Sequence, residues 1–412
     1  MGKVKSLLIA LLSLACPLII CSNTRAGALL LNGAYLSAGI IPSEESNSSD
    51  IPVNSESENS SVSFAESVSD SENTHQVTED NSFGNFASGN GSESSEDNSD
   101  GISEDISDLS ESQTLPLRGR IIDKNRSTLT DDTDYSVFTE ESGKIYRYSY
   151  GRFNSDDYIN LPSGAQVRNC TDISNDVLEK AAGELPDYGK DYDYSKPQVL
   201  IYHTHTSESF LPFSDTYDDN YPIRSVDDNR NIVAVGDAVC NALSERGISV
   251  VHDCTVHDYP MYTGAYYRSA ETILENLEEY PDIKLVIDIH RDGIVNGDGS
   301  LYAPVAEIDG KSAAQFMLIS CCDNGEFDMP NYMENFRLAC LLQNCSERAF
   351  PGLARPVLFD YRNYNQSLST GSLLIEVGSH GNSLEEAVYT GELLGNAIAD
   401  ALDILKNENT GL

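Results

Sequence analysis

Strand-like and helix-like patterns alternate along the chain from residue 196 to its C-terminus. Apolar runs rich in β-branched residues occur at 198–206, 248–253, 284–293, 313–322 and 371–379. Apolar residues recur at helical spacing at 231–247, 263–281, 331–352 and 383–405. Strands that alternate with helices of this length are typical of an α/β sheet with helices on both faces, and roughly 215 residues suit one such domain. We therefore expect residues 196–412 to form a three-layer α/β domain.

The segment 42–116 has a composition that argues against a folded core. No Lys or Arg occurs between Ile41 and Leu117, and Ser, Asn, Asp, Glu and Gly dominate there. Because the segment has few apolar side chains, their burial cannot offset the conformational entropy lost on ordering. We therefore expect a disordered acidic spacer. The whole chain has a formal net charge of -40, and residues 196–412 hold 13 Lys and Arg against 33 Asp and Glu. Nucleic acid is not expected as a partner, because it is bound largely through basic side chains.

The N-terminal region, 1–41, has the layout of a secretory signal or a membrane anchor. Lys3 and Lys5 precede an apolar run from Leu7 to Ile20, and this arrangement directs export. The run is shorter than the roughly 20 residues that span a bilayer, which favours a cleaved signal. The residues around the candidate cleavage positions favour an uncleaved anchor instead. We expect a single N-terminal anchor in the cell membrane with the rest of the chain outside, or a secreted protein if the leader is cleaved.

A less regular stretch, 117–195, lies between the spacer and the α/β pattern. Residues 143–169 suggest two or three short strands, and residues 175–185 suggest a helix. We interpret this stretch as a small lead-in subdomain that packs on the α/β domain or contacts a partner.

Three of the apolar runs end in ionisable residues. His203, His205 and Glu208 lie at the end of the first run, and Glu376 lies in the last. The run at 284–293 ends in a further charged set, Asp288, His290, Arg291 and Asp292. In a parallel or mostly parallel sheet the carboxyl ends of the strands lie at one edge, where open α/β proteins bind ligands. We expect these side chains to meet there.

Two imidazoles and several carboxylates in one cleft suit a catalytic zinc site. Such a site needs three protein ligands and an open position for water. Zinc lowers the pKa of that water to about 7, and a carboxylate that is not a ligand can accept its proton during attack on a carbonyl. The sequence therefore predicts zinc-dependent hydrolytic chemistry at this edge of the sheet.

The residues alone leave several assignments open. His203 and His205 are two apart, so on a strand they face the same side, and one can be a ligand while the other supports it from behind. Glu208 follows a serine and can instead cap a turn or a helix. Glu376 would be costly to bury unpaired, so its alternative role is a structural salt bridge with Arg291.

Six segments form a series over about residues 196–401: KPQVLIYHTHTSESF, NIVAVGDAVCNAL, VIDIHRDG, PGLARPV, YNQSLS and LLIEVGSHGNSLEEA. A weaker similarity, NCTDIS, lies at 169–174. Together they resemble the stage II sporulation protein P family of endospore-forming Firmicutes. The resemblance implies a zinc-amidase fold of the phosphorylase/hydrolase-like type. It also implies a membrane-anchored N-acetylmuramoyl-L-alanine amidase with associated endopeptidase activity, which acts on peptidoglycan during engulfment with stage II sporulation proteins D and M as partners.

The resemblance also implies metal ligands. His203, Glu208 and His290 match positions that the family needs for activity. Related zinc amidases take their middle ligand from a glutamate near the start of the following helix, where this chain reads DDNRNIVAV without a glutamate. Glu208 takes that place here, with His205 as the alternative. We expect His203, Glu208 and His290 to bind Zn²⁺.

Two further residues receive catalytic roles. Glu376 matches the strand that supplies the catalytic carboxylate of related zinc amidases, so we expect it to deprotonate the attacking water. Arg291 could then stabilise the developing oxyanion or orient Glu376.

A catalytically inert wall-binding or scaffold module of the engulfment machinery is the alternative function. A degenerate enzyme should have lost at least one metal-competent residue, whereas this chain retains the full set. A peptidase with an unrelated substrate is a further alternative, and the products of digestion would distinguish the three.

Overall fold

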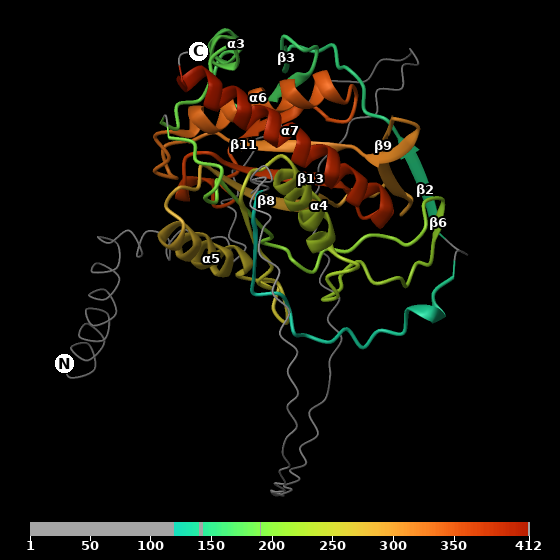
Figure 1. Cartoon of the computed structure of the whole chain (residues 1–412). Coiled ribbons are helices and arrows are strands. Elements are labelled where there is room, and N and C mark those ends of the chain that lie inside the picture. The colour runs from blue at the N-terminus through green and yellow to red at the C-terminus, as the bar shows by residue number, and fades with distance from the viewer. Residues whose placement is uncertain (1–118, 140–142, 190, 411–412) are drawn as a thin grey trace, which may run out of the picture. The chain divides into compact units, whose positions relative to one another are not determined.

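The structure is a computed structural model that describes residues 119–139, 143–189 and 191–410 (Figure 1). The predicted anchor and spacer lie outside these residues. Within the described part of the chain, no helix combines the length and the apolar character needed to cross a membrane. The helices are α3 (Asn175–Ala182), α4 (Ile232–Glu245), α5 (Ala265–Glu279), α6 (Tyr332–Ala349) and α7 (Leu384–Thr410).

The strands form two sheets. They are β1 (Ile121–Lys124), β2 (Gly143–Tyr148), β3 (Tyr158–Asn160), β4 (Gln166–Asn169), β5 (Val199–Tyr202), β6 (Thr216–Tyr217), β7 (Val250–Asp253), β8 (Leu285–Asp292), β9 (Leu301–Ile308), β10 (Lys311–Ala314), β11 (Phe316–Cys321), β12 (Val357–Asp360) and β13 (Ser372–Ser379). The larger sheet has nine strands in the order β1-β7-β5-β8-β13-β11-β12-β4-β3, and the smaller has four in the order β10-β9-β2-β6.

The three strands expected to carry the site are neighbours in the larger sheet. β8 pairs in parallel with β5 on one side and with β13 on the other. The parallel arrangement is broken where β11 pairs antiparallel with β13 and β3 antiparallel with β4. The carboxyl ends of β5, β8 and β13 therefore lie at one edge of the sheet, as the sequence predicted. We call this edge the rim.

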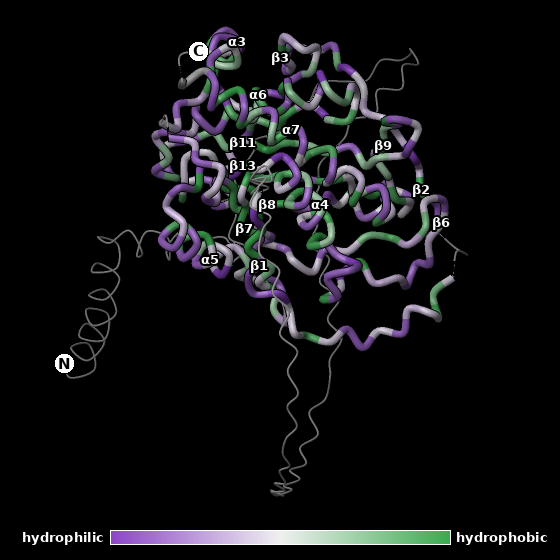
Figure 2. Tube along the Cα trace, viewed as in Figure 1, coloured by the Kyte–Doolittle hydropathy of each residue, from purple (hydrophilic) through white to green (hydrophobic). Residues whose placement is uncertain are grey.

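Helices cover both faces of the larger sheet, which confirms the predicted three layers. Val199 and Ile201 of β5 belong to the large core cluster that also holds the buried residues of α4, α6 and α7. Leu200 and Tyr202 of the same strand pack with Ile273 of α5 in a second cluster. Alternate residues of β5 therefore point to opposite helical layers. In Figure 2 the central strands are coloured largely as apolar.

Local sequence explains where these elements begin and end. β8 begins with the apolar residues Leu285, Val286 and Ile287 because both of its faces are covered, and seven of its eight residues are buried. α4 begins at the N-cap Asn231, whose side chain accepts from the amide of Val233. The chain leaves α4 through Gly247, whose φ of 80° is left-handed. α5 ends shortly before Pro281, which cannot continue a helix.

Residues predicted as a lead-in subdomain contribute to both sheets. β1 pairs in parallel with β7, and β4 pairs in parallel with β12. β2 joins the smaller sheet beside β9. The predicted short strands and helix of this stretch are confirmed. Strands from both sides of residue 195 share the larger sheet. The predicted domain boundary between residues 195 and 196 therefore does not separate two sheets, and it stays a prediction.

Candidate active site

The chain turns sharply after β5 and brings Glu208 back to β8. The strand ends at Tyr202, four residues earlier than the apolar run suggested. The amide of Glu208 donates to the carbonyl of His205 at 3.0 Å, which closes a tight turn. Its carboxylate reaches β8, where Oε2 accepts from the amide of Arg291 at 3.1 Å. The side chain of Glu208 therefore lies at the rim, and the cap of the following helix is Asn231 instead.

His290 lies between two carboxylates at the rim. Its Nδ1 is 3.5 Å from Oε2 of Glu208, and its Nε2 is 2.9 Å from Oδ1 of Asp288. Burial opposes the charged form of His290, but the carboxylates of Asp288 and Glu208 outweigh it and raise its pKa well above the ordinary value. Burial likewise opposes ionisation of Glu208, and the contact with His290 overcomes it and lowers the pKa of that carboxyl. These three side chains form one buried charged unit.

His205 joins this unit through its ring. The rings of His205 and His290 meet edge to face with centroids 5.2 Å apart. Tyr262 stacks on His205 at 4.5 Å, and its hydroxyl lies 3.1 Å from Nε2 of His205. Nδ1 of His205 is buried and has no hydrogen-bond partner among the described residues. Burial lowers the pKa of His205 to about 4, so the ring is neutral at pH 7.

His203 lies in a different place from His205. Its Nδ1 is 2.8 Å from the carbonyl oxygen of Ile289, and its Nε2 is 3.0 Å from Nε2 of His252. Burial, with the neighbouring His252, lowers the pKa of His203 to about 3. Because β5 ends at Tyr202, the alternation expected of a strand does not extend to these histidines, and the expectation that both face the same side is wrong.

Glu376 lies at the rim on the neighbouring strand. In the register of β13 and β8 it is the partner of His290. The side chain is half-buried, yet Oε2 is buried and has no hydrogen-bond partner in the described chain. Burial, and then the charge of Asp292, raise the pKa of Glu376 to about 8. A carboxyl group in this state can hold or release a proton near neutral pH.

The hydrogen bonds of Arg291 go to backbone carbonyls. Its Nε donates to Ser209 at 2.9 Å, its Nη2 to Ile223 at 2.8 Å and its Nη1 to Asp292 at 3.3 Å. The guanidinium thus ties the loop after β5 to the end of β8. Its expected action on an oxyanion or on Glu376 stays a prediction.

The donor chemistry of the rim fits a zinc ion. His205 and His290 each have Nε2 beside another polar group, which leaves Nδ1 of each ring for a metal, and Glu208 adds a carboxylate oxygen. Two imidazoles and one carboxylate are a known ligand set of catalytic zinc. Of the three predicted ligands, the structure brings Glu208 and His290 together and places His205, not His203, beside them. The ligand assignment itself stays a prediction.

A second group of possible ligands lies away from the rim. One oxygen each of Asp123 and Asp237 and one nitrogen of His252 lie within 4.8 Å of one another. Arg126 forms ion pairs with both carboxylates, at 3.2 Å to Asp123 and closer to Asp237. A guanidinium therefore already supplies positive charge to this group.

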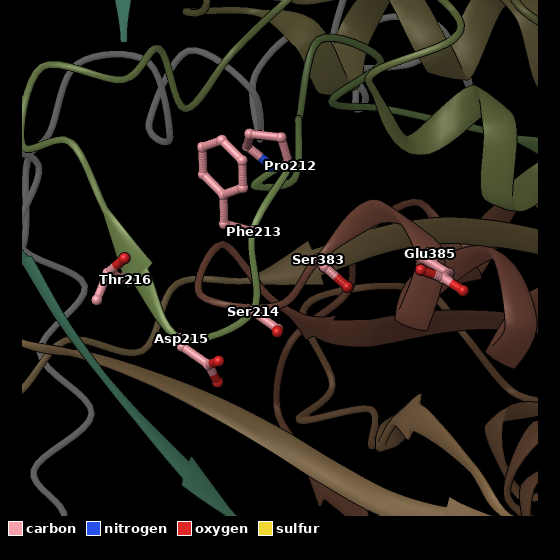
Figure 3. A pocket seen from close by; sticks show the side chains of 7 residues that line it. All are labelled: Pro212, Phe213, Ser214, Asp215, Thr216, Ser383 and Glu385. Carbon is pink, nitrogen blue, oxygen red and sulfur yellow. The ribbon is translucent and has the colours of Figure 1, made fainter. Parts of the chain in front are cut away.

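A surface pocket lies beside the loop after β5 (Figure 3). Its lining comes from that loop, from the first residue of β6 and from the beginning of α7 with the residue before it, namely Pro212, Phe213, Ser214, Asp215, Thr216, Ser383 and Glu385. None of the predicted site residues lines it, and its two carboxylates are not accompanied by a cation in this lining.

Several residues that hold the site were not found by sequence reasoning. Tyr262 comes from the loop before α5, and the sequence of that loop contains no recognisable motif. His252 and His257 lie at or just after the end of a strand and carry no motif, yet Nε2 of His252 contacts His203 and Nδ1 of His257 lies 2.8 Å from the carbonyl oxygen of His203. Asp288 was visible as a charged residue inside an apolar strand, and that signal could have identified it.

Comparisons with known proteins agree with the sequence resemblance. Residues 33–399 match the family described as Stage II sporulation protein P (SpoIIP). Stage II sporulation protein P of Bacillus subtilis (strain 168) is 30% identical over 222 residues, which cover 50% of this chain and 50% of that relative. The match thus spans about half the length of this curated relative.

Two solved structures show a distant likeness. An N-acetylmuramoyl-L-alanine amidase from Clostridium difficile 630 is 14% identical with a TM-score of 0.32, over 51% of this chain and 96% of that chain. An N-acetylmuramoyl-L-alanine amidase of Nostoc punctiforme is 15% identical with a TM-score of 0.31, over 53% of this chain and 100% of that chain.

Proposed function

The chain belongs to the stage II sporulation protein P family, and from this premise we propose that it is a cell-wall hydrolase of sporulation. The reaction proposed is zinc-dependent cleavage of the amide between N-acetylmuramic acid and L-alanine in peptidoglycan, with endopeptidase activity on the stem peptide at the same site. The sequence resemblance supports this reaction. The activity, substrate and partners of the whole protein are all part of the proposal.

One observation carries the proposal: four metal-competent or basic side chains converge at the rim. Glu208 lies 3.5 Å from His290, His205 packs edge to face on His290, and Glu376 is the register partner of His290. We assign His205, Glu208 and His290 as zinc ligands, so that His205 replaces the predicted His203. Glu376 is the base.

The chain's own residues prepare this site for hydrolysis. When bound, zinc supplies a Lewis acid that lowers the pKa of a water molecule from about 15.7 to about 7. Glu376, as the carboxylate, accepts a proton at its buried Oε2, where burial raises its affinity for a proton. Asp288 and Tyr262 lie at Nε2 of His290 and of His205, and such outer contacts fix the tautomer and orientation of metal-binding imidazoles.

The proposal includes a location. Residues 1–41 anchor the enzyme in the cell membrane, with the catalytic domain in the space between the forespore and the mother cell. Peptidoglycan is the substrate there, and stage II sporulation proteins D and M are the partners. Fractionation of sporulating cells tests the location, and recovery in the soluble fraction would contradict an anchor.

Digestion of purified sacculi by the full chain tests the function. We expect release of intact stem peptides, identified by mass spectrometry, and zinc in the purified protein. A chelator should abolish release, and added Zn²⁺ should restore it. His290→Ala should lower the rate more than about 100-fold through loss of the metal. His75→Ala, a matched change in the acidic spacer, should not.

The same experiment separates the alternatives. A wall-binding scaffold would sediment with sacculi and release nothing. A peptidase of unrelated substrate would leave sacculi intact but cleave other peptides in a zinc-dependent way. Full hydrolysis by His290→Ala, or by protein freed of metal, would overturn the mechanism.

A further inference from the structure

A chain of hydrogen bonds runs from α4 through two buried histidines to β8. Oδ1 of Asp237 lies 3.0 Å from Nδ1 of His252, and Nε2 of His252 lies 3.0 Å from Nε2 of His203. Nδ1 of His203 then lies 2.8 Å from the carbonyl oxygen of Ile289. Both imidazole rings are fully buried. Asp237, at one end of these hydrogen bonds, is partly exposed to solvent.

Donor and acceptor chemistry fixes the protons in this chain. A carbonyl and a carboxylate can only accept, so Nδ1 of His203 and Nδ1 of His252 both carry a hydrogen. The contact between the two Nε2 atoms needs one more hydrogen. One Nε2 atom therefore donates to the other, while Asp237, which is also paired with Arg126, accepts from Nδ1 of His252. Both ring nitrogens of His203 are occupied, so this arrangement leaves neither for a metal.

The histidine pair is built around a glycine of α4. A Cβ at Gly236 would lie 2.5 Å from Nε2 of His252 and 2.7 Å from Nε2 of His203. Both distances are shorter than any van der Waals contact, so the pair needs a residue without a side chain at this position. Gly236 and Asp237 are consecutive: one gives space to the imidazoles and the other gives them charge. These two roles account for the residues Gly236 and Asp237 in the motif NIVAVGDAVCNAL.

His203 touches both segments that carry the proposed ligands. The ladder between β5 and β8 ends at Tyr202 and Asp288, and the ring of His203 supplies the next bond, to the peptide that leads into His290. The carbonyl oxygen of His203 accepts from Oγ1 of Thr206 at 2.9 Å and lies 2.8 Å from Nδ1 of His257. These contacts hold the turn on which His205 and Glu208 lie.

We propose that His203 is a positioning residue, oriented by His252 and Asp237, which aligns His290 with the turn that carries His205 and Glu208. The proposal rests on the proposed function, because the residues it aligns are the proposed zinc ligands. A positioning residue and a ligand at 203 respond differently to substitution. Asparagine can keep the bond to the Ile289 carbonyl, since its amide nitrogen stands near the place of Nδ1, but it is a poor zinc ligand.

Zinc affinity of the full chain is the first test. We expect His203→Asn to bind Zn²⁺ within about threefold of the unmodified protein, whereas His203→Ala should bind about 10- to 100-fold more weakly. The kcat for sacculi should follow the same order while KM stays unchanged. His290→Ala is the reference for loss of a ligand. If His203→Asn loses zinc to the same extent as His290→Ala, position 203 holds the metal and the proposal is overturned.

Imidazole nitrogen NMR of the metal-free full chain is the second test. The chain has only seven histidines, so labelling at histidine gives few signals. We expect Nδ1 of both His203 and His252 to carry a hydrogen, with the two rings coupled through their Nε2 atoms. His252→Gln, which keeps a donor toward His203, should preserve the Nδ1 signal of His203. His252→Phe and Gly236→Ala should abolish it.

The two tests distinguish failure of the inference from failure of the proposed function. If the unmodified protein binds no zinc and releases nothing from sacculi, the proposed function fails, and the NMR signals still decide whether the hydrogen-bonded chain exists. If zinc binding and hydrolysis are present but the Nδ1 proton of His203 is absent, the inference alone fails.

Discussion

Glu376 on β13 lies opposite His290 on β8 in the parallel register of these two strands. Register partners in a sheet point to the same face, so a carboxyl group with a raised pKa stands beside a histidine that also contacts Asp288 and Glu208. The proposed base and the proposed ligands are thus fixed by strand pairing as well as by loops. Sites built on strands hold their geometry more precisely than sites built on loops alone.

Replacing Glu376 by glutamine should abolish most hydrolysis without harming the fold. The buried Oε2 has no partner in the described chain, so an amide of the same size loses no hydrogen bond there. Removal of a general base costs about 100- to 10,000-fold in rate. We expect kcat on sacculi to fall within that range, with zinc content and melting temperature unchanged. Glu392→Gln on the exposed side of α7 is the control. A rate within threefold of the unmodified protein would exclude Glu376 as the base.

Replacing Arg291 by lysine should loosen the loop after β5. One ammonium cannot serve the carbonyls of Ser209, Ile223 and Asp292 together, because they are bound through three separate nitrogens of the guanidinium. We expect chymotrypsin to cleave within 209–223 roughly five times faster, since local stability governs such cleavage. Hydrolysis should fall in parallel. Lost hydrolysis with unchanged cleavage would support the role at Glu376 that the sequence suggested.

The helices of the α/β domain and the strands of the rim could be predicted from the sequence because both depend on local patterns. A strand buried on both faces, such as β8, must be apolar along its length, so Asp288 and His290 stand out as exceptions. Parallel pairing then brings strand ends together without any knowledge of side-chain contacts.

The place of His203 could not be predicted, because it depends on contacts between distant segments. The alternation of a strand stops at Tyr202, and nothing in the letters HTHT marks that end. The ring of His203 instead packs against Gly236 of α4 and contacts Nε2 of His252 on β7, and both of these residues come later in the sequence. Tyr262 likewise reaches His205 from a loop without regular pattern.

A methyl group at Gly395 should destabilise the packing of α7 on α4. Its Cβ would lie 2.6 Å from the carbonyl oxygen of Val239 and 2.7 Å from Cβ of Ala242. Alanine gains about 1 kcal/mol of helix propensity over glycine. Overpacking against a backbone atom costs about 1–3 kcal/mol, so we expect Gly395→Ala to lower the free energy of unfolding by about 1 kcal/mol. Denaturant titration measures it.

The adjacent residue provides the control for that change. Asn396 is more exposed and bonds within its own helix, to the carbonyl of Glu392. Asn396→Ala gains helix propensity without a new contact, so its free energy of unfolding should stay equal or rise. If Gly395→Ala is as stable as Asn396→Ala, the two helices separate more easily than their contact distances imply.

Glu386 in the first turn of α7 should make stability depend on pH. Its carboxylate accepts from Arg147 on β2, from Ser312 on β10 at 2.8 Å and from Asn382 at 3.0 Å. Burial opposes its ionisation, but these bonds prevail and lower its pKa below 4.5. A carboxyl with a lowered folded pKa binds fewer protons folded than unfolded, so its contribution is complete above about pH 4.5 and is lost as pH falls through the folded pKa. We expect Glu386→Gln to lower the free energy of unfolding by about 2 kcal/mol at pH 7, less than for a fully buried pair because Arg147 is partly exposed.

The difference in free energy of unfolding between the two proteins, measured by denaturant titration, should stay constant from pH 7 to about pH 5. It should shrink below about pH 4.5, where the unmodified carboxyl takes up its proton. A difference that stays the same down to pH 3 would mean that the shape of the side chain, and not its charge, holds the smaller sheet against α7.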